Sequence, residues 1–486
     1  MNITDLSRLM NPRSIAVIGA SNRDGSPGKI IFHGLASSLC RLYPVHPVEK
    51  EILGHPVLSS VDFLPQDIDL AVITVNAREA VKSALACASK SIPFIIIVSS
   101  GFGETGPEGK ALETRLREIP KQFQTRILGP NSLGIFVPAD HLDTIFVEHG
   151  DKALANGGGV AFITQSGSVG VEALGLASNT GFGMRAFVGL GNKCDLDELD
   201  FLRYFSTDPG TSCLAFYLEN IEHGMVFLRE AKAIAKTKPV VILKAGRTPG
   251  GIRAVTSHTG RMAGTDNILN GLFKQYGILR AMDDEELCDA AKTFSMLPLP
   301  DGNRVAVVTP AGGFGVVCVD YIESRHRGID LTLAELHPRT VDRIRRETLP
   351  FASCNNPIDL TAGADDAMFG CALDALLEDS GVDIIICTAF FAPPAVSDRL
   401  IDKIAARVRM GRKPIIVFTQ YGPFTDLYLR RMHNAGVVGF PSISRTVRAA
   451  RFLVERRRSL AGSAVPADNL PISNDLESHR SNYDTH

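Results

Sequence analysis

The chain has 486 residues, of which 45% are hydrophobic and 21% are charged, and its formal net charge at pH 7 is −2. Such a length suggests about three domains of roughly 150 residues, each able to bury a core, and the composition is that of an ordinary globular protein. The balanced charge, and the lack of a basic stripe with interleaved aromatic residues, exclude nucleic acid as an expected partner.

The cysteines and the apolar segments indicate the compartment. Nine cysteines occur, and no two have C-x-x-C spacing, which argues against a disulfide framework or a zinc knuckle and for a reducing environment. The N-terminus lacks the apolar core of a signal peptide. The richest apolar run, residues 384–392, is far shorter than the roughly 20 residues of a membrane span. We therefore expect a cytoplasmic protein with no membrane partner.

Residues 1–150 alternate short apolar runs with helical stretches. This alternation predicts a parallel sheet with helices on its faces, the Rossmann type of α/β domain. The predicted strands are residues 14–19, 41–46, 69–75, 93–98 and 126–128.

Two further α/β domains follow. The second is predicted over residues 151–297, and the linker Leu297–Gly302 separates it from a third over 303–460, which closes with a helix near 445–457. The polar tail, residues 461–486, is predicted to be disordered. The predicted strands are 160–164, 185–188, 213–218 and 239–243 in the second domain, and 304–309, 383–388 and 414–419 in the third.

One short pattern occurs three times. Ala16, Ala161 and Ala306 stand at matching points, 145 residues apart in each case. Each copy predicts a buried strand, a turn of small residues, and a helix whose N-terminus can hold an anion. Three copies at domain-sized spacing suggest a chain of flavodoxin-like modules that handle phosphate.

A histidine lies in a stretch rich in Gly, Thr and Ser, residues 246–264, which we interpret as a loop. His258 is flanked there by small hydroxyl side chains, in Thr256-Ser257-His258-Thr259-Gly260. An imidazole in this setting is well placed as a covalent nucleophile. The alternative is a histidine satisfied by local hydrogen bonds.

A carboxylate and two serines add to this candidate site. Glu219 follows a buried strand, at the end of a parallel sheet that usually carries sites, and could fix the tautomer of an imidazole; alternatively it is an ordinary acid at a helix N-terminus. Ser166-Gly167-Ser168 could cradle a phosphate or could simply cap a helix.

Several spaced motifs make the chain resemble the NDP-forming acyl-CoA synthetases, whose type member is ADP-forming acetate–CoA ligase. The resemblance runs from about residue 8 to about 455 in one domain order. It also places the chain in the superfamily of the succinyl-CoA synthetase α subunit. The motifs are Thr164-Gln165-Ser166-Gly167-Ser168, Gly189-Leu190-Gly191-Asn192-Lys193, Tyr217-Leu218-Glu219 and Ser257-His258-Thr259-Gly260.

The resemblance implies roles for the second domain. It implies that His258 is phosphorylated during turnover and that Glu219 holds its imidazole. It further implies that Ser166, Gly167 and Ser168 receive the phosphate, in agreement with the attraction of a helix N-terminus for a phosphoryl dianion.

The first domain resembles the family's CoA-binding domain. The resemblance implies that Gly19, Ala20, Ser21 and Asn22 take the CoA phosphates. It implies walls near the pantetheine formed by Ser99–Glu104, with Ser100 and Gly101, and by Gly129–Ser132, with Asn131 and Ser132. One alternative is an NAD site, which is weakened because Ser21 stands where the second glycine of G-x-G-x-x-G belongs. The other is a purely structural tight turn.

The third domain resembles the family's ligase-CoA domain, in which Gly312, Gly313 and Gly315 match a second phosphate-receiving helix start. Phe314 replaces the usual proline there and Pro310 replaces an asparagine. The segment Asn356–Leu360 also matches, or is simply a turn at a strand edge.

The resemblance implies a partner and a reaction. No segment after residue 461 resembles the ATP-grasp module that binds Mg²⁺ and ADP or ATP, so we expect a separate ATP-grasp β subunit, in a heterotetramer, and no metal on this chain. The implied reaction interconverts acyl-CoA, ADP and phosphate with a carboxylic acid, CoA and ATP, through an acyl phosphate and a phosphohistidine. The alternative is a protein that binds CoA or acyl-CoA without ligase activity.

Overall fold

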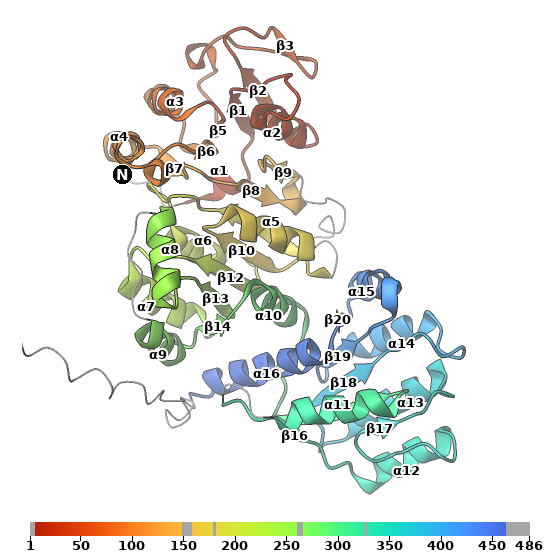
Figure 1. Ribbon diagram of the computed structural model, residues 1–486. Helices are drawn as coiled ribbons and strands as arrows, with labels where there is room; N and C mark the ends of the chain where they lie inside the picture. The colour runs from red at the N-terminus through yellow and green to blue at the C-terminus, as the bar shows by residue number, and fades with distance from the viewer. Residues whose placement is uncertain (1–4, 148–157, 178–180, 260–265, 325–327, 463–486) are drawn as a thin grey trace, which may run out of the picture.

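The computed structural model describes residues 5–147, 158–177, 181–259, 266–324 and 328–462, and for residues 256–259 only the backbone. Three α/β domains follow one another along the long axis of the molecule (Figure 1). The predicted tail, residues 461–486, lies almost entirely outside the described residues.

The first domain is a five-stranded parallel sheet in the order β2-β1-β5-β6-β7. Its central strands are wholly buried apolar runs, which is typical of a parallel sheet covered on both faces. The strands are β1 (Ser14–Ile18), β2 (Arg41–Val45), β5 (Leu70–Ile73), β6 (Phe94–Ile97) and β7 (Arg126–Leu128), and β3 (Glu51–Ile52) pairs with β4 (His55–Pro56). The helices are α1 (Ser7–Met10), α2 (Pro27–Leu35), α3 (Ala77–Ser89), α4 (Pro107–Gln122) and the short 3-10 helices η1 (Val61–Phe63) and η2 (Gly103–Thr105).

The second domain has seven strands in the order β14-β13-β12-β10-β11-β8-β9. Helices α5 and α10 contribute to the core on one face of this sheet, and α6, α7 and α9 to the core on the other. The strands are β8 (Gly134–Val137), β9 (Leu142–Asp143), β10 (Val160–Thr164), β11 (Met184–Gly189), β12 (Cys213–Leu218), β13 (Val240–Lys244) and β14 (Leu279–Ala281). The helices are α5 (Gly167–Leu176), α6 (Glu198–Thr207), α7 (Gly224–Ile234), α8 (Pro249–Thr259), α9 (Asp266–Tyr276) and α10 (Asp284–Met296).

The third domain repeats the same plan, with β17 added beside the carboxyl end of β15. Its main strand order is β16-β15-β18-β19-β20. The strands are β15 (Arg304–Thr309), β16 (Thr332–Leu333), β17 (Ile358–Asp359), β18 (Ile384–Thr388), β19 (Ile415–Phe418) and β20 (Val438–Phe440). The helices are α11 (Gly312–Glu323), α12 (Pro338–Glu347), α13 (Asp366–Glu378), α14 (Arg399–Val408), α15 (Thr425–Asn434) and α16 (Ile443–Leu460).

The fold class is confirmed, and the predicted strands agree with the observed ones to within two residues at each end. In all three sheets the parallel strands follow the doubly wound order 2-1-3-4-5, counted along each domain and with β17 left out of the third. The repeated strands β1, β10 and β15 each lie in the interior of their sheet, next to the point where the strand order reverses. In such sheets ligands bind beyond the carboxyl ends of the strands at that point.

The second and third copies of the pattern share one detail. The Thr164 hydroxyl donates to the carbonyl of Ser166 at 2.8 Å and accepts from its N–H at 3.1 Å. The Thr309 hydroxyl does the same for Ala311, at 2.9 and 3.1 Å. In these two copies the last residue of the strand therefore fixes the turn that leads into the helix.

The boundary between the first two domains differs from the predicted one at residue 150. Strand β8 pairs antiparallel with β11, and β9 pairs antiparallel with β8, so residues 134–143 belong to the second sheet. The prediction placed them in the first domain because they precede the glycine-rich segment 157–159. Position along the chain does not decide which domain this hairpin belongs to, since an antiparallel hairpin can pair with the edge of either neighbouring sheet.

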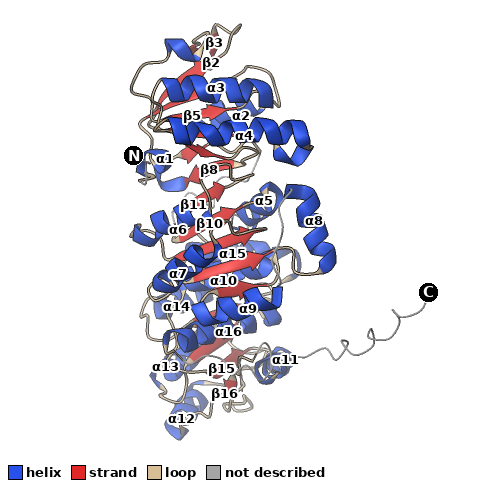
Figure 2. Ribbon diagram, turned by 90° about the vertical axis from the view of Figure 1, so that its left-hand side faces the viewer, coloured by secondary structure: helices blue, strands red, loops and turns tan. Residues whose placement is uncertain are grey.

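The second and third domains share a continuous core and a buried ionic joint. Residues of α5 and α10 cluster with residues of α11 and α16. Asp289 of α10 accepts from Arg445 of α16 at 2.6 and 2.9 Å, and from Arg448 at 2.8 Å. The Asp289 side chain is only 2% exposed. These two domains are therefore packed as a unit. Figure 2 shows the helices of the chain in blue. Among the described residues, none of these helices is long and apolar enough to cross a bilayer.

Candidate active site

The segment after β10 forms the predicted anion-holding helix start. Ser166 caps α5, and its hydroxyl accepts from the N–H of Val169 at 3.4 Å and lies 3.0 Å from the hydroxyl of Ser168. Gly167 and Ser168, the first two residues of α5, are exposed. The first turn of a helix carries N–H groups without an intrahelical acceptor, so this end can receive an anion.

Gln165 joins this turn to the predicted carboxylate. Its Oε1 accepts from the N–H groups of Glu219 at 2.6 Å and Asn220 at 3.1 Å, and its Nε2 donates to Asn220 Oδ1 at 2.8 Å. The structure thus brings the Ser166 turn and Glu219 together, because β10 and β12 are neighbours in the sheet. No role for Gln165 was predicted from the sequence, although this residue stands inside one of the recognised motifs.

Charges gather at this edge of the sheet. Glu219 is 5% exposed, and burial together with the Glu219 charge raises the pKa of Tyr217 to about 12. Lys244 ends the next strand, β13, and its Nζ donates to the carbonyl of Ala245 at 2.5 Å. Burial lowers the pKa of Lys244 to about 8, against the opposing effect of Asp266 and Glu219. A buried carboxylate and a buried amine therefore lie at the carboxyl ends of adjacent strands.

The predicted loop around His258 is wrong over residues 249–259, which form helix α8. Thr248 precedes the helix, and its Oγ1 accepts from the N–H of Gly251 at 3.0 Å. Pro249, the first helical residue, has the backbone angle that a helix start needs. His258 thus lies in the last turn of α8; its side chain and Gly260 lie outside what the structure describes.

Helix α8 lies against the first domain. It packs on η2, residues Gly103–Thr105, which belongs to one of the predicted CoA walls. Figures 1 and 2 show α8 beside the second sheet, with one end toward the first domain. The helix that carries His258 and the loop 99–104 are therefore neighbours, although about 150 residues of sequence separate them.

In the first domain, a close contact of two glycines shapes the turn after β1. Gly19 has φ +89°, and a Cβ built on Gly28 would lie 2.0 Å from the carbonyl oxygen of Gly19. Only glycine permits this approach. The turn is longer than predicted, because α2 starts at Pro27 with Ser26 as its cap. Ala20 is buried and the Ser21 hydroxyl accepts from Arg23. Asn22 is exposed and donates to Glu49 at 3.0 Å.

Some residues of the two predicted CoA walls are exposed, and others are buried and hydrogen-bonded within the protein. Ser100 and Asn131 are exposed, and Gly101 has φ +101°. Ser132 is buried, and its hydroxyl donates to the carbonyl of Gly189 at 2.5 Å. This hydroxyl therefore joins the first two domains and is not carried into the candidate site. Burial raises the pKa of Glu104, but hydrogen bonds, from Asn192 above all, outweigh it and leave the pKa lowered.

In the third domain, a carboxylate lies next to the predicted second anion site. Gly312 and Gly313 start α11 and Gly315 is its fourth residue. A Cβ built on Gly312 would lie 2.8 Å from Asp359 Oδ2. The Phe314 ring packs edge-on against Phe390 and Phe418. In both views α11 lies at the end of the molecule opposite the first domain, so this chain does not join the α11 start to the α8 region (Figures 1 and 2).

Known families match all three domains. A model of a CoA binding domain matches residues 13–138, one of a succinyl-CoA ligase like flavodoxin domain matches 157–294, and one of a ligase-CoA domain matches 305–446.

Similar proteins match over nearly the whole chain. The alpha subunit of acetate–CoA ligase [ADP-forming] II from Pyrococcus furiosus is 34% identical over 464 residues, covering 94% of this chain and 99% of that protein. Acetate–CoA ligase [ADP-forming] I from Archaeoglobus fulgidus is 33% identical over 473 residues, covering 97% of this chain and 66% of that longer protein. The solved structure of a Ca. Korarchaeum cryptofilum acetyl-coenzyme A synthetase 1 in complex with phosphate and ADP superposes with a TM-score of 0.86 at 31% identity, covering 95% of this chain and 98% of that one.

Proposed function

This chain belongs to the ADP-forming acetate–CoA ligase family, with whose alpha subunits it aligns over nearly its full length, and from that premise we propose how it works. Acyl-CoA and phosphate react at the first domain, and the phosphoryl group passes to His258. A partner subunit then transfers it to ADP. The observation that carries this proposal is the packing of α8, the helix of His258, against η2 of the CoA-binding domain.

The proposed chemistry has two steps on this chain. A phosphate oxygen attacks the thioester carbonyl, the C–S bond breaks, and CoA leaves as the thiolate, giving an acyl phosphate. An imidazole nitrogen of His258 then attacks phosphorus and the carboxylate leaves. Glu219 holds the other ring nitrogen and stabilises the positive charge on the ring. The α5 start, with Ser166, Gly167 and Ser168, stabilises the phosphoryl dianion.

We propose CoA as the ligand of the first domain, bound along Gly19–Asn22, Ser100, Gly101 and Asn131. The contact of Gly28 with Gly19 supports this, because it lets the start of α2 approach the end of β1 closely. A pyrophosphate needs such a backbone approach.

Gly28→Ala should weaken CoA binding by the full-length chain at least about tenfold, a loss of roughly 1.4 kcal/mol. The new methyl would meet a backbone oxygen at 2.0 Å, so α2 must move away from the strand end. Isothermal titration with CoA and with NADH measures this. Gly271→Ala, on α9 with open space around the Cβ, is the matched control and should bind CoA as the wild type does. Binding of NADH but not CoA would overturn the ligand assignment.

For the nucleotide half of the reaction we propose an ATP-grasp partner subunit that holds Mg²⁺ and ADP or ATP, in a heterotetramer. The names of the alpha-subunit relatives imply a second subunit. Phosphoryl transfer to a nucleotide needs a cradle for its phosphates and a metal ion, and the sequence has no G-x-x-x-x-G-K-[ST] loop.

Residues 1–486 alone should therefore form no acetyl-CoA from ATP, CoA and acetate. Addition of an ATP-grasp subunit of this family should restore formation, measured as ADP release with a coupled assay. Steady ATP turnover by the pure chain, with no second polypeptide, would contradict the need for a partner.

A further inference from the structure

The segment Gly189–Lys193 joins the two halves of the candidate site. It belongs to a recognised motif, but it has no part in the proposed function. The backbone N–H groups of Asn192, Cys194 and Leu196 donate to carbonyls of Pro130, Gly129 and Ile127, at 2.8, 2.9 and 3.0 Å. The segment after β11 therefore lies along the chain of the first domain, at the interface of the two domains.

The Asn192 side chain reaches into the first domain. Its Nδ2 donates to Glu104 Oε2 at 2.7 Å and to Glu113 Oε2 at 3.0 Å, and its Oδ1 accepts from Asn131 at 3.4 Å. The other oxygen of Glu104 accepts from the N–H groups of Gly101 and Phe102, at 2.6 and 3.1 Å. Asn192 thus holds the carboxylate that shapes the 101–104 loop, and α8 packs on that loop.

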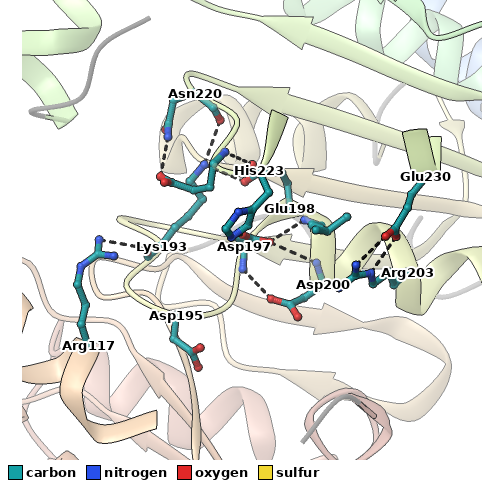
Figure 3. Close-up of polar contacts among 12 residues, drawn as sticks. Arg117, Lys193, Asp195, Asp197, Glu198, Asp200, Arg203, Asn220, His223 and Glu230 are labelled. Atoms are coloured by element: carbon teal, nitrogen blue, oxygen red, sulfur yellow. Dashed lines mark hydrogen bonds and ion pairs between the residues drawn. The ribbon is translucent and has the colours of Figure 1, made fainter. Parts of the chain in front are cut away.

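The Lys193 side chain reaches into the second domain. Its Nζ donates to Glu198 Oε2 at 2.8 Å and to the carbonyl of Asn220 at 3.0 Å (Figure 3). The side chains of Lys193 and Glu198 are 0% and 1% exposed. Asn220 directly follows Glu219. Lys193 therefore holds the turn that carries the proposed partner of the imidazole.

The surrounding charges keep this arrangement fixed. The second oxygen of Glu198 accepts from the N–H of Glu222 at 2.7 Å, so Glu198 is held at both oxygens. Arg117 of the first domain donates to the backbone carbonyl of Lys193 at 3.4 Å (Figure 3). Lys193 itself has φ 55°, an uncommon backbone angle for a non-glycine residue. A buried ion pair is a weak source of stability compared with an apolar pair, but it specifies geometry.

We propose that Asn192 and Lys193 are positioning residues that set the distance between the 101–104 loop of the first domain and the Glu219 turn of the second. They act through Glu104 and through the Asn220 carbonyl. Because consecutive Cα atoms are about 3.8 Å apart, the link between the two contacts is short and stiff. This inference rests on the proposed function: it gives the acyl phosphate and the imidazole a fixed meeting point.

Lys193→Met tests the link. Methionine fills nearly the same space as lysine, but it loses both the ion pair with Glu198 and the hydrogen bond to the Asn220 carbonyl. We expect the rate of phosphohistidine formation from acetyl-CoA and labelled phosphate to fall about 100-fold, the effect of a displacement of about 1 Å. The KM for acetyl-CoA should stay within about twofold of the wild-type value, because the first domain keeps its contacts.

Glu198→Gln is the matched control. It removes the same buried charge pair, but Lys193 can still donate to the Asn220 carbonyl. The rate of phosphohistidine formation by this variant should stay within about tenfold of the wild-type rate, even if the variant unfolds at a lower temperature. If both variants lose rate in proportion to their loss of stability, the role of Lys193 is only structural and the proposal is wrong.

Asn192→Ala tests the other half of the link and should fold, since both glutamates keep other donors. We expect a lower label rate together with a higher KM for acetyl-CoA, because the 101–104 loop loses a contact. A wild-type rate of labelling together with a wild-type KM for acetyl-CoA would overturn the proposal. No labelling of the wild-type chain would instead contradict the proposed function, so the two failures are distinguishable.

Discussion

His258→Asn should abolish phosphohistidine formation from acetyl-CoA and labelled phosphate, and with a partner subunit should lower kcat by about 10⁴-fold or more. Removal of a covalent nucleophile has effects of this size. Asparagine keeps a polar side chain at the end of α8 but has no nucleophilic nitrogen. The label should be acid-labile and alkali-stable, and peptide mapping should place it at His258 in the wild type. CoA binding should be unchanged, because the proposed CoA contacts lie in the first domain, which matches a CoA binding domain model.

His223→Asn is the matched control for this experiment. His223 lies in the same domain, is 64% exposed, and has Asp197 at 3.6 Å (Figure 3). The His223→Asn variant should form phosphohistidine at the wild-type rate. Wild-type labelling of His258→Asn would refute the phosphohistidine assignment. A wild-type chain that binds CoA but never labels would favour the alternative of a CoA-binding protein without ligase activity.

Asp289→Asn should be the most destabilising of the substitutions considered, with a loss of about 3 kcal/mol. The change leaves Arg445 and Arg448 of α16 facing an uncharged amide in a place where Asp289 is 2% exposed, while Glu285, whose side chain is 46% exposed, still pairs with both arginines at 3.2 and 2.7 Å. Loss of the buried carboxylate from this ionic cluster leaves the arginine charges only partly compensated. We expect the thermal midpoint of the second and third domains to fall by about 6 °C or more, measured by calorimetry.

Asp301→Asn is the control for the ionic joint. Asp301 is 92% exposed and lies 3.7 Å from Arg457 of the same α16. An exposed pair of this kind contributes little, so its midpoint should not change measurably. Equal midpoints for Asp289→Asn and the wild type would mean that the joint does not stabilise the contact between the domains.

The central strands could be predicted from the sequence because each is a continuous buried apolar run. Ile95 to Ile97 and Val305 to Val308 are fully buried, and such runs form the middle of parallel sheets. The short strands β8, β9, β14, β16, β17 and β20 were missed, because two to four residues carry too weak a pattern. Helix α8 was missed because Gly250 and Gly251 outweighed the start signals of Thr248 and Pro249.

Part of the candidate site also follows from the sequence. Ser166 and Glu219 stand directly after strands, and the ends of neighbouring parallel strands meet at one edge. Gln165, Asn192 and Lys193 could not be given roles, because their partners, apart from Glu198, lie tens of residues away and depend on the strand order and the domain contact. Asp359 was missed beside Gly312 for the same reason, since β17 reaches it only through its pairing with β15.

The position of β8 and β9 determines where the chain can be divided. A fragment ending at residue 150 would carry this hairpin without its partner β11 and would expose Ile135, Phe136 and Val137, which are at most 9% exposed in the whole protein. Uncovered apolar strands of this kind promote aggregation. A second fragment starting after 150 would in turn lack the strands that cover one edge of its sheet. A fragment meant to contain the first domain alone should therefore end near residue 130. Proteolysis near residue 150 should not release the first domain as a separate folded fragment.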